Sequence, residues 1–565
     1  MKPDTRLHPT VKPLLAALLV AFFPLATQAA GPAAPNAGSI LQEIKPMAPQ
    51  PPSSVGTGLT IERAGSAKMP PSAPFLVKTI RITGNENIDS VTLHALVADG
   101  EGKSLNLIQL GKLVARITDY YRSHGYPLAR AVIPAQTVQD GVLVIEIIEA
   151  RYGIIRLDND SRVNTPLLEK TLSPLQSGQA IGQAEMDSAL LMLSDIPGIT
   201  VNATLKPGEA VGTSDLAVNA AAGPALAGNV TLDNYGNQYT GRVRLGGTVN
   251  FVNPLRHGDV LSMSGLSSGE ELNYGRVAYE WLLSGKGTRL GASYSSLRYV
   301  LGGSLSNLNS QGTAEVGSLW AKHPMVRQQD INLYGKIQYD QMALRDHIDL
   351  TDLRTDRSLR TWTLSLAGDE RDALLAGGVT TWNATLTSGH VRMNDVAAQL
   401  ADAATARTEG GFSKWNLSFA RLQALNPENT VYLAFSGQWA NDNLDSSQKM
   451  IAGGPYTVRA YDMGSISGDS GYLGTAEFRR NLGSAWKGQW QAVAFVDSAH
   501  ITVNQTTWIT GENSATLSGV GVGLNWAESN QWNARAYVAT RLGSTPALVA
   551  RTSATRGWIE IGRSF

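Results

Sequence analysis

The sequence predicts a transmembrane β-barrel of about 16 antiparallel strands, preceded by two small α/β domains. Residues 224–565 alternate apolar and polar side chains with the two-residue period of strands, and no helical period interrupts them. Residues 75–150 and 151–223 each read as strand, helix, helix, strand, strand. At about 21 residues per strand and connection, the C-terminal segment holds about 16 strands, within the range of bacterial outer-membrane barrels.

Composition narrows the class of protein. The chain has 565 residues, a length that suggests two to four domains. Its 47 basic and 47 acidic residues leave no net charge that would attract nucleic acid. The chain has no cysteine, which suits an oxidising compartment outside the cytoplasm.

The N-terminus has the parts of an export signal. Basic residues precede an apolar run at residues 14–26, and small residues follow it before Ala30. A membrane anchor is the weaker alternative, because the run is shorter than the roughly 20 residues that cross a membrane and Pro24 interrupts it. We therefore predict a signal peptide over residues 1–29.

Residues 30–74 are rich in proline, alanine, serine and glycine. This composition predicts a mobile linker and not a domain. Within the linker, SILQEIKPM (39–47) has a helical pattern that could form one or two turns before Pro46.

Residues 75–150 make the first α/β domain. FLVKTIRITG predicts a strand that ends at a Gly84-Asn85 turn, and VTLHALV is weakly helical. The helix of LGKLVARITDYYRSHG puts Leu113, Ile117 and Tyr121 on one face and ends at Gly125. LARAVIPAQ and VLVIEIIEA predict the two closing strands.

Residues 151–223 repeat this order. YGIIRLDN predicts a strand, and Thr165-Pro166 starts a helix. A second helix places Met186, Leu190 and Leu193 on one stripe before two closing strands. Two tandem copies of one small unit explain the pattern better than one larger domain.

The alternation of the C-terminal segment is clearest in two places. VYLAFSGQWA (431–440) puts its large apolar side chains on one face, and GVGVGLNW (519–526) alternates glycine with large apolar residues. The chain ends on Phe565, with Ile559 and Ile561 on the same face, which predicts a C-terminal barrel signal. The alternative is a soluble β-sandwich. It is disfavoured because so many strands have no second helical layer and no cysteine framework beside them.

Four segments match one known family closely. They are SALLMLSDIPGITVNATLKPGEAVGTSDL (188–216), LDNYGNQYTGRVRLGGTVNFVNPLRHGD (232–259), VRAYD (458–462) and FVDSA (495–499). Nearly all of the mature chain resembles the two-partner secretion transporters, the family of the filamentous-haemagglutinin and haemolysin exporters. This family belongs to a superfamily of barrels with periplasmic POTRA domains. Ala460 and Ala499 stand where the family usually has glycine, but the charged residues of both motifs are present.

The resemblance implies a domain order, a location and partners. It implies two POTRA domains in the periplasm (75–150 and 151–223) and a barrel (224–565) in the outer membrane of a Gram-negative bacterium. The POTRA domains would capture a large unfolded exoprotein, such as an adhesin or haemolysin, and the barrel would translocate it. Outer-membrane lipid and the barrel assembly machinery are the other implied partners. The family often has a helix that plugs the pore, and residues 39–47 are the candidate.

The resemblance also implies a latch. In the family, the arginine of the VRAYD-like motif lies on a loop that folds into the barrel and pairs with a strand aspartate. Carried over, Arg459 pairs with Asp497. The alternation agrees, because Asp497 shares a face with Phe495, opposite small apolar residues that suit lipid. The implied site residues are Val458, Arg459, Tyr461, Asp462, Phe495 and Asp497. The alternative is a solvated Arg459 on an external loop.

Two other functions fit parts of the sequence. An assembly factor of the same superfamily usually has more POTRA repeats than two, and a diffusion porin lacks tandem periplasmic domains.

GDSG (468–471) matches a serine-protease motif within a Gly/Ser-rich stretch, and GVGVG is no phosphate loop because no βα unit surrounds it. The eight histidines show no metal-ligand spacing. We therefore expect no enzymatic activity, metal, cofactor or nucleic-acid partner.

Overall fold

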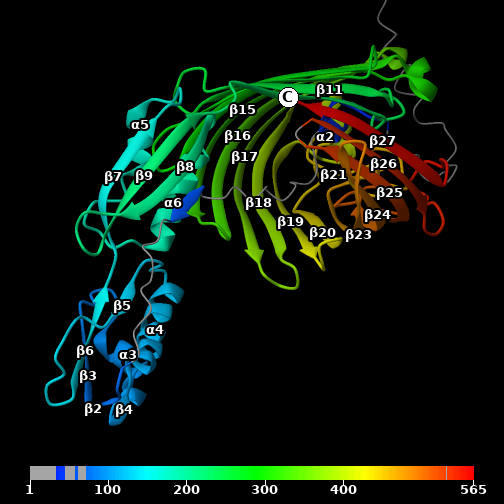
Figure 1. Ribbon diagram of the computed structural model, residues 1–565. Helices are drawn as coiled ribbons and strands as arrows, with labels where there is room; N and C mark the ends of the chain where they lie inside the picture. The colour runs from blue at the N-terminus through cyan, green and yellow to red at the C-terminus, as the bar shows by residue number, and fades with distance from the viewer. Residues whose placement is uncertain (1–33, 45–57, 62–71, 530) are drawn as a thin grey trace, which may run out of the picture.

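The computed structural model describes residues 34–44, 58–61, 72–529 and 531–565. Two α/β units form an arm that extends from one end of a large closed barrel (Figure 1). The predicted signal peptide and much of the predicted linker lie outside the described residues.

The first α/β unit has the predicted order of elements with two differences. Its strand at 75–84 is split in two, and a short strand was not predicted between the helices. The three-stranded sheet has the order β3-β6-β5, and β2 pairs with β4. The elements are β2 (Phe75–Val77), β3 (Thr79–Thr83), α3 (Ser90–Ala95), η1 (Ala98–Gly100), β4 (Lys103–Leu105), α4 (Leu107–Ser123), β5 (Arg130–Val132) and β6 (Val142–Ile148).

Helix α4 contributes five buried residues to the core of this unit, more than any other element. It starts with a capping box, in which Asn106 and Gln109 each accept from the other's backbone N–H. The apolar stripe that the sequence predicts is buried against the sheet, with Ile117 and Tyr121 fully enclosed. This packing fixes the helix across the sheet.

The second α/β unit also has the predicted order. Met186, Leu190 and Leu193 are fully buried in its core, as the stripe predicts. The elements are β7 (Arg151–Asn159), α5 (Thr165–Leu172), α6 (Gln183–Ser194), β8 (Ile199–Pro207) and β9 (Thr213–Ala222). The sheet gains a strand from the linker, because β1 (Leu59–Ile61) pairs in parallel with β8. The prediction of a mobile linker is therefore wrong at these three residues.

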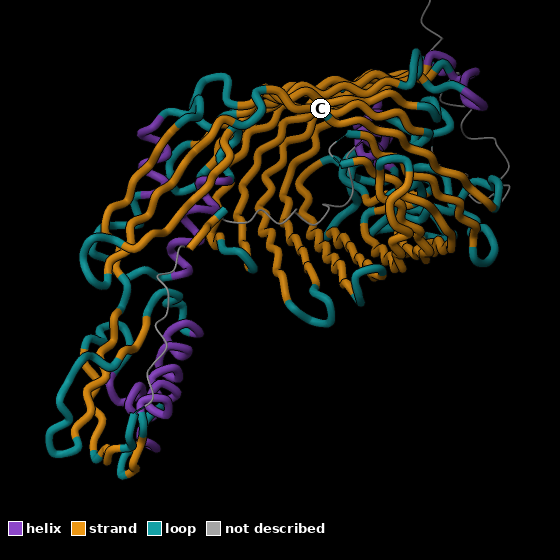
Figure 2. The backbone as a smooth tube through the Cα atoms, in the orientation of Figure 1, coloured by secondary structure: helices purple, strands orange, loops and turns teal. Residues whose placement is uncertain are grey.

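The barrel closes with 16 antiparallel strands, which confirms the predicted class. Figure 2 shows the strands as one continuous wall. The strands are β10 (Leu226–Asp233), β11 (Arg244–Val252), β12 (Val260–Ser267), β13 (Leu272–Leu282), β14 (Arg289–Val300), β15 (Ser310–Arg327), β16 (Ile331–Ile348), β17 (Leu353–Asp372), β18 (Gly378–Met393), β19 (Gly410–Ala424), β20 (Asn429–Ala440), β23 (Ser470–Ala485), β24 (Gly488–Thr502), β25 (Ser514–Glu528), β26 (Trp532–Arg541) and β27 (Thr555–Ser564).

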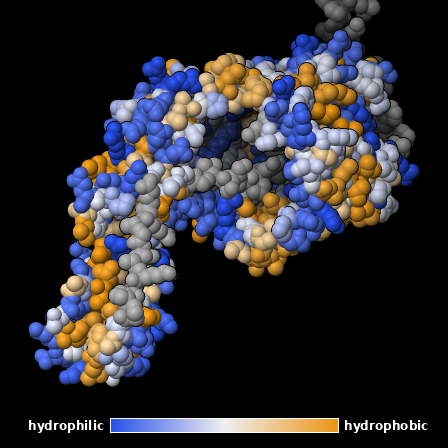
Figure 3. Space-filling view, in the orientation of Figure 1, coloured by the Kyte–Doolittle hydropathy of each residue, from blue (hydrophilic) through white to orange (hydrophobic). Residues whose placement is uncertain are grey.

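Side chains alternate between the outer and inner faces of the wall as the sequence predicts. Leu433 and Phe435 on β20 and Val522 on β25 are exposed on the outside. Figure 3 shows apolar residues on the outer wall and a hollow with a hydrophilic interior at the centre of the barrel. An apolar outside and a polar inside are what a barrel in lipid requires.

One prediction for this segment is wrong. A helix, α7 (Val396–Ala404), lies in the connection between β18 and β19, where the sequence shows no helical period. It is rich in alanine, and Asp395 caps it by accepting from the N–H groups of Ala397 and Ala398. The segment VAAQLADAA buries almost nothing, so it lacks the apolar stripe that periodicity detects.

No helix among the described residues is long and apolar enough to cross a membrane.

The second α/β unit is joined to the barrel by a specific ion pair. Asp195, at the end of α6, accepts from Arg327 Nε at 2.7 Å and from Arg327 Nη2 at 2.9 Å. Leu282, at the end of β13, packs into the hydrophobic core of the unit. These contacts fix the unit against the short turns at this end of the barrel.

Glu149 stabilises the end of the first unit that faces the second. Its carboxylate accepts from Tyr121 Oη at 2.7 Å and from the backbone N–H groups of Glu86 and Asn87, each at 2.9 Å. Burial alone would raise the pKa of Glu149, but these hydrogen bonds hold it below its ordinary value.

Glu149→Gln is expected to destabilise the first unit by about 1–3 kcal/mol, because a Gln NH₂ group would face N–H donors. Because the pKa is lower in the folded state, the contribution of Glu149 is complete above its unfolded pKa and is lost as pH falls through its folded pKa. Hydrogen exchange of peptides from residues 75–150 measures both effects. Equal exchange in wild type and variant from pH 7 to pH 3 would contradict the assignment.

Candidate functional site

A long connection between β20 and β23 folds into the barrel. This inward loop (441–469) contains two short paired strands, β21 (Met450–Ala452) and β22 (Ile466–Gly468). Gly453 allows the turn, since its φ is 102° and a Cβ there would overlap the carbonyl oxygen of Asp462. Most residues of the loop are buried, and Figure 1 shows β21 inside the barrel.

The tip of the inward loop presents Arg459 to the barrel wall. Arg459 Nε donates to Asp497 Oδ2 at 2.9 Å, and Nη2 donates to Oδ1 at 2.7 Å. The Arg459 backbone N–H also donates to Asp497 Oδ2, at 3.1 Å. Arg459 is 5% exposed and Asp497 is fully buried. The structure thus brings the predicted pair together in the two-pronged geometry that suits arginine and carboxylate.

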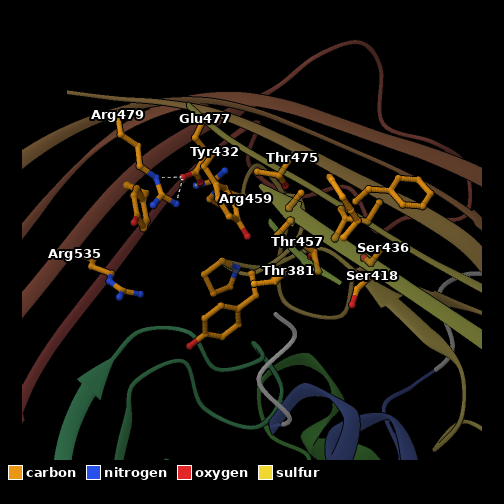
Figure 4. A pocket seen from close by; sticks show the side chains of 18 of the residues that line it. Thr381, Ser418, Tyr432, Ser436, Thr457, Arg459, Thr475, Glu477, Arg479 and Arg535 are labelled. Carbon is orange, nitrogen blue, oxygen red and sulfur yellow. Dashed lines mark hydrogen bonds and ion pairs between the residues drawn. The ribbon is translucent and has the colours of Figure 1, made fainter. Parts of the chain in front are cut away.

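A second carboxylate, which sequence reasoning missed, completes the site. Arg459 Nη1 donates to Glu477 Oε1 at 2.6 Å, and Arg479 Nε donates to Glu477 Oε2 at 2.8 Å (Figure 4). Strand alternation could have found Glu477, because Thr475, Glu477 and Arg479 share the inner face of β23 and Thr475 pairs with Asp497 in the register. Two arginines and two carboxylates make the cluster neutral.

Aromatic side chains hold the Arg459 guanidinium from the other sides. Its central carbon lies 3.4 Å from the ring centroid of Phe495, a cation–π contact. Trp558 Nε1 on β27 donates to the Arg459 carbonyl at 2.7 Å. Val458 is fully buried beside them. The loop tip is thus held by backbone as well as side-chain contacts.

The other predicted motif residues form a second group nearby. Asp462 accepts from Arg242 Nη1 at 2.8 Å and from Arg556 Nη2 at 2.5 Å. Tyr461 is buried, with the Arg541 guanidinium 5.6 Å from its ring centroid. The structure therefore divides the predicted site residues between an Arg459 cluster and an Asp462 cluster.

A short helix, α2 (Ala37–Ile44), also lies inside the barrel. It begins two residues before the predicted segment. Ala37, Ile40 and Leu41 pack against inward side chains of β14 and β16, toward the end of the barrel that carries the long loops. The Ala37 N–H donates to Asp346 Oδ1 at 2.7 Å, where a carboxylate meets the positive end of the helix.

Helix α2 also contacts the inward loop directly. Gln42 Nε2 donates to the Ser447 carbonyl. Asn237 Nδ2 bridges the two segments, because it donates to Glu43 Oε1 of α2 at 2.9 Å and to the Met463 carbonyl of the loop at 3.2 Å. The two inserted segments therefore lie against each other within the lumen.

A cavity of about 170 Å³ lies beside the Arg459 cluster. Tyr432, Thr457 and Tyr537 line it together with Arg459 and Glu477 (Figure 4). Its volume is below the roughly 300 Å³ of a small-ligand pocket.

The remaining predicted features lie elsewhere. Ile559, Ile561 and Phe565 are about half exposed on the outer face, and their role as an assembly signal stays a prediction. In the GDSG stretch, Asp469 accepts from Lys449 Nζ at 2.6 Å and Ser470 Oγ donates to Gln505 Oε1 at 3.3 Å. These contacts position the base of the inward loop.

The chain is similar to known families and proteins. Residues 212–526 match the family described as haemolysin secretion/activation protein ShlB/FhaC/HecB, and residues 75–150 match the ShlB-type POTRA domain. The heme/hemopexin transporter protein HuxB of Haemophilus influenzae (strain 86-028NP) is 25% identical over 541 residues, which cover 94% of this chain and 95% of HuxB.

The transporter CdiB matches this chain both in sequence and in its solved structure. The outer membrane transporter CdiB of Escherichia coli is 24% identical over 477 residues, covering 80% of this chain and 76% of CdiB. The solved structure of CdiB from Escherichia coli superposes with a TM-score of 0.70 at 22% identity, covering 91% of this chain and 94% of that chain. The two proteins therefore share a fold.

Gly38→Ala is expected to unseat α2 even though alanine favours helix. A Cβ at Gly38 would overlap Ser446 Oγ and lie 2.6 Å from the backbone nitrogen of Ser447. Ion conductance of the purified protein in planar bilayers should rise as the lumen empties. Gly317→Ala is the matched control, because a Cβ there meets nothing within 4 Å. Equal conductance in the two variants would contradict the seating of α2 on the loop.

Proposed function

The chain belongs to the haemolysin secretion/activation family, and we propose that two segments inside its barrel hold the export pore closed at rest. Family membership confirms the predicted class, a two-partner secretion transporter that exports a partner exoprotein across the outer membrane. The proposed closing segments are the inward loop and α2. The observation that carries the proposal is the neutral ion cluster that Arg459 and Arg479 form with Asp497 and Glu477, in which Arg459 and both carboxylates are buried.

The Arg459 cluster suits a latch that has two states. Removing one partner from a buried ion pair costs about 3–5 kcal/mol, because the other charge is left buried and unpaired. If the whole loop withdraws into water, every charge regains solvent and the cost is smaller. Partial movement is therefore unfavourable, and the loop is either seated or withdrawn.

The domain roles follow the predicted boundaries. We assign residues 75–150 and 151–223 to capture of the unfolded exoprotein and residues 224–565 to translocation. An extended peptide can add to a free sheet edge through backbone hydrogen bonds. In the second unit the three residues of β1 cover part of the β8 edge, so the longer free edge for a client in this state is β7. In the first unit, β3 and β5 are the sheet edges.

The partners follow from the surface and the family. We propose a large, β-rich exoprotein of adhesin or haemolysin type as the client. Outer-membrane lipid would cover the apolar outer wall, and the barrel assembly machinery would recognise Ile559, Ile561 and Phe565 during insertion. Folding of the client outside the cell would give export its direction. Export would then need no nucleotide hydrolysis, and we propose that the protein has no enzymatic activity.

The proposal is tested by exchanging the charges of the latch. Arg459→Asp and Asp497→Arg should each abolish export, because each change leaves like charges buried together in the barrel wall, and the double variant should restore part of it. Quantitative mass spectrometry of culture supernatants and outer membranes measures the exported protein and names the client. Arg345→Asp is the control, because the Arg345 side chain is 55% exposed and its pairing with Glu315 is loose, at 3.7 Å.

Two results would contradict the proposal. Normal export in both single variants would remove the latch. Broad depletion of unrelated barrels from the outer membrane, in a strain that lacks the gene, would instead indicate an assembly factor.

A further inference from the structure

The barrel is closed by its shortest strand pairing. β10 and β27 pair over five residues, Asn229–Asp233 against Glu560–Ser564. Every other pair of neighbouring barrel strands pairs over at least eight residues. Beyond Asp233, Asn234 continues the contact with bonds to Ile559 and Gly557, and the chain then leaves the strand while β27 runs on to Thr555. The first part of β27, from Thr555, therefore has no partner strand on its β10 side.

Asp462 of the inward loop joins the two sides of this seam. Arg556, on the inner face of β27, donates from Nη2 to Asp462 Oδ2 at 2.5 Å. Arg242, in the connection from β10 to β11, donates from Nη1 to Asp462 Oδ1 at 2.8 Å. The Asp462 side chain is 7% exposed. One buried carboxylate therefore ties both sides together, with one oxygen for each.

Further contacts of the loop are divided between the same two sides. Trp558 on β27 donates to the Arg459 carbonyl at 2.7 Å, and Asn237 beside β10 donates to the Met463 carbonyl at 3.2 Å. Tyr235 packs edge-on to Tyr456 of the loop and to Trp558, with ring centroids 5.5 Å and 5.9 Å apart. The loop lies across the inside of the seam where the backbone ladder ends.

We propose that Asp462 is a positioning residue that staples the β10–β27 seam from inside the barrel. The inference rests on the proposed function, because it gives withdrawal of the loop a second consequence. When Asp462 leaves, the seam loses its inner tie, and Arg242 and Arg556 face each other as unpaired like charges. The wall loosens at its shortest pairing at the same time as the lumen empties. The pore can then widen beyond the diameter of the resting barrel.

The test measures hydrogen exchange of the purified full-length protein without client. Asp462→Asn should speed exchange of peptides from β10 and from residues 555–565 by about tenfold, since it removes hydrogen bonds between charged groups. Arg242→Gln removes the ion pair with Asp462 on the β10 side, at a side chain that is 40% exposed. It should speed exchange of the same peptides. Heat-modifiable mobility in gels shows that each variant barrel is folded.

The matched control is Asp372→Asn. Asp372, at the end of β17, accepts from Arg421 on β19 at 2.8 Å and 3.1 Å, and neither strand neighbours β10 or β27. This variant should leave exchange at the seam unchanged. Unchanged seam exchange in Asp462→Asn, or an equal increase in Asp372→Asn, would overturn the staple. Both results are independent of the charge-exchange export assay, so the latch and the staple fail separately.

Discussion

The seated position of the inward loop depends on the burial of one guanidinium, that of Arg459. A cation inside a low-dielectric wall needs anions at contact distance, and the structure supplies Asp497 from β24 and Glu477 from β23. The same requirement fixes the path of the loop, because only a chain that turns sharply at Gly453 can bring Arg459 to these carboxylates. A buried pair of this kind contributes more to a single defined arrangement than to net stability.

The same constraint recurs at the other inserted segment. Arg357 on β17 lies between Asp346 at 2.7 Å and Asp445 at 2.6 Å, and Asp346 also accepts from the first N–H of α2. Asp445 belongs to the inward loop, so a shared charge network seats both α2 and the loop. Withdrawal of the loop takes Asp445 away from Arg357, and release of α2 takes one N–H donor away from Asp346. This shared network provides a physical basis for coordinated opening.

Much of this architecture was predictable from periodicity. The two-residue alternation predicts the strands and the inward direction of Asp497, because a lipid-facing wall leaves charges only one side to occupy. The Arg459–Asp497 pairing came from family resemblance, and Glu477 was missed although it shares an inner face with Thr475. Strand β1 was not predicted, because three residues carry no period. The family resemblance gave residues 39–47 as a candidate pore helix, but the contacts of α2 were not predicted, because a helix of eight residues gives no long-range signal. Contacts between segments distant in sequence decide both.

If the Arg459 cluster acts as a latch, the inward loop must leave the lumen for export. Ala460 approaches the wall at Gly519, where an added Cβ would lie 2.5 Å from the Ala460 Cβ, so cysteines at both positions fall within disulfide reach after a small shift. The chain has no native cysteine to compete. Export of the partner is measured in cells before and after reduction of this tether. We expect no export while the tether is oxidised and recovery on reduction, and equal export in both states would contradict the latch.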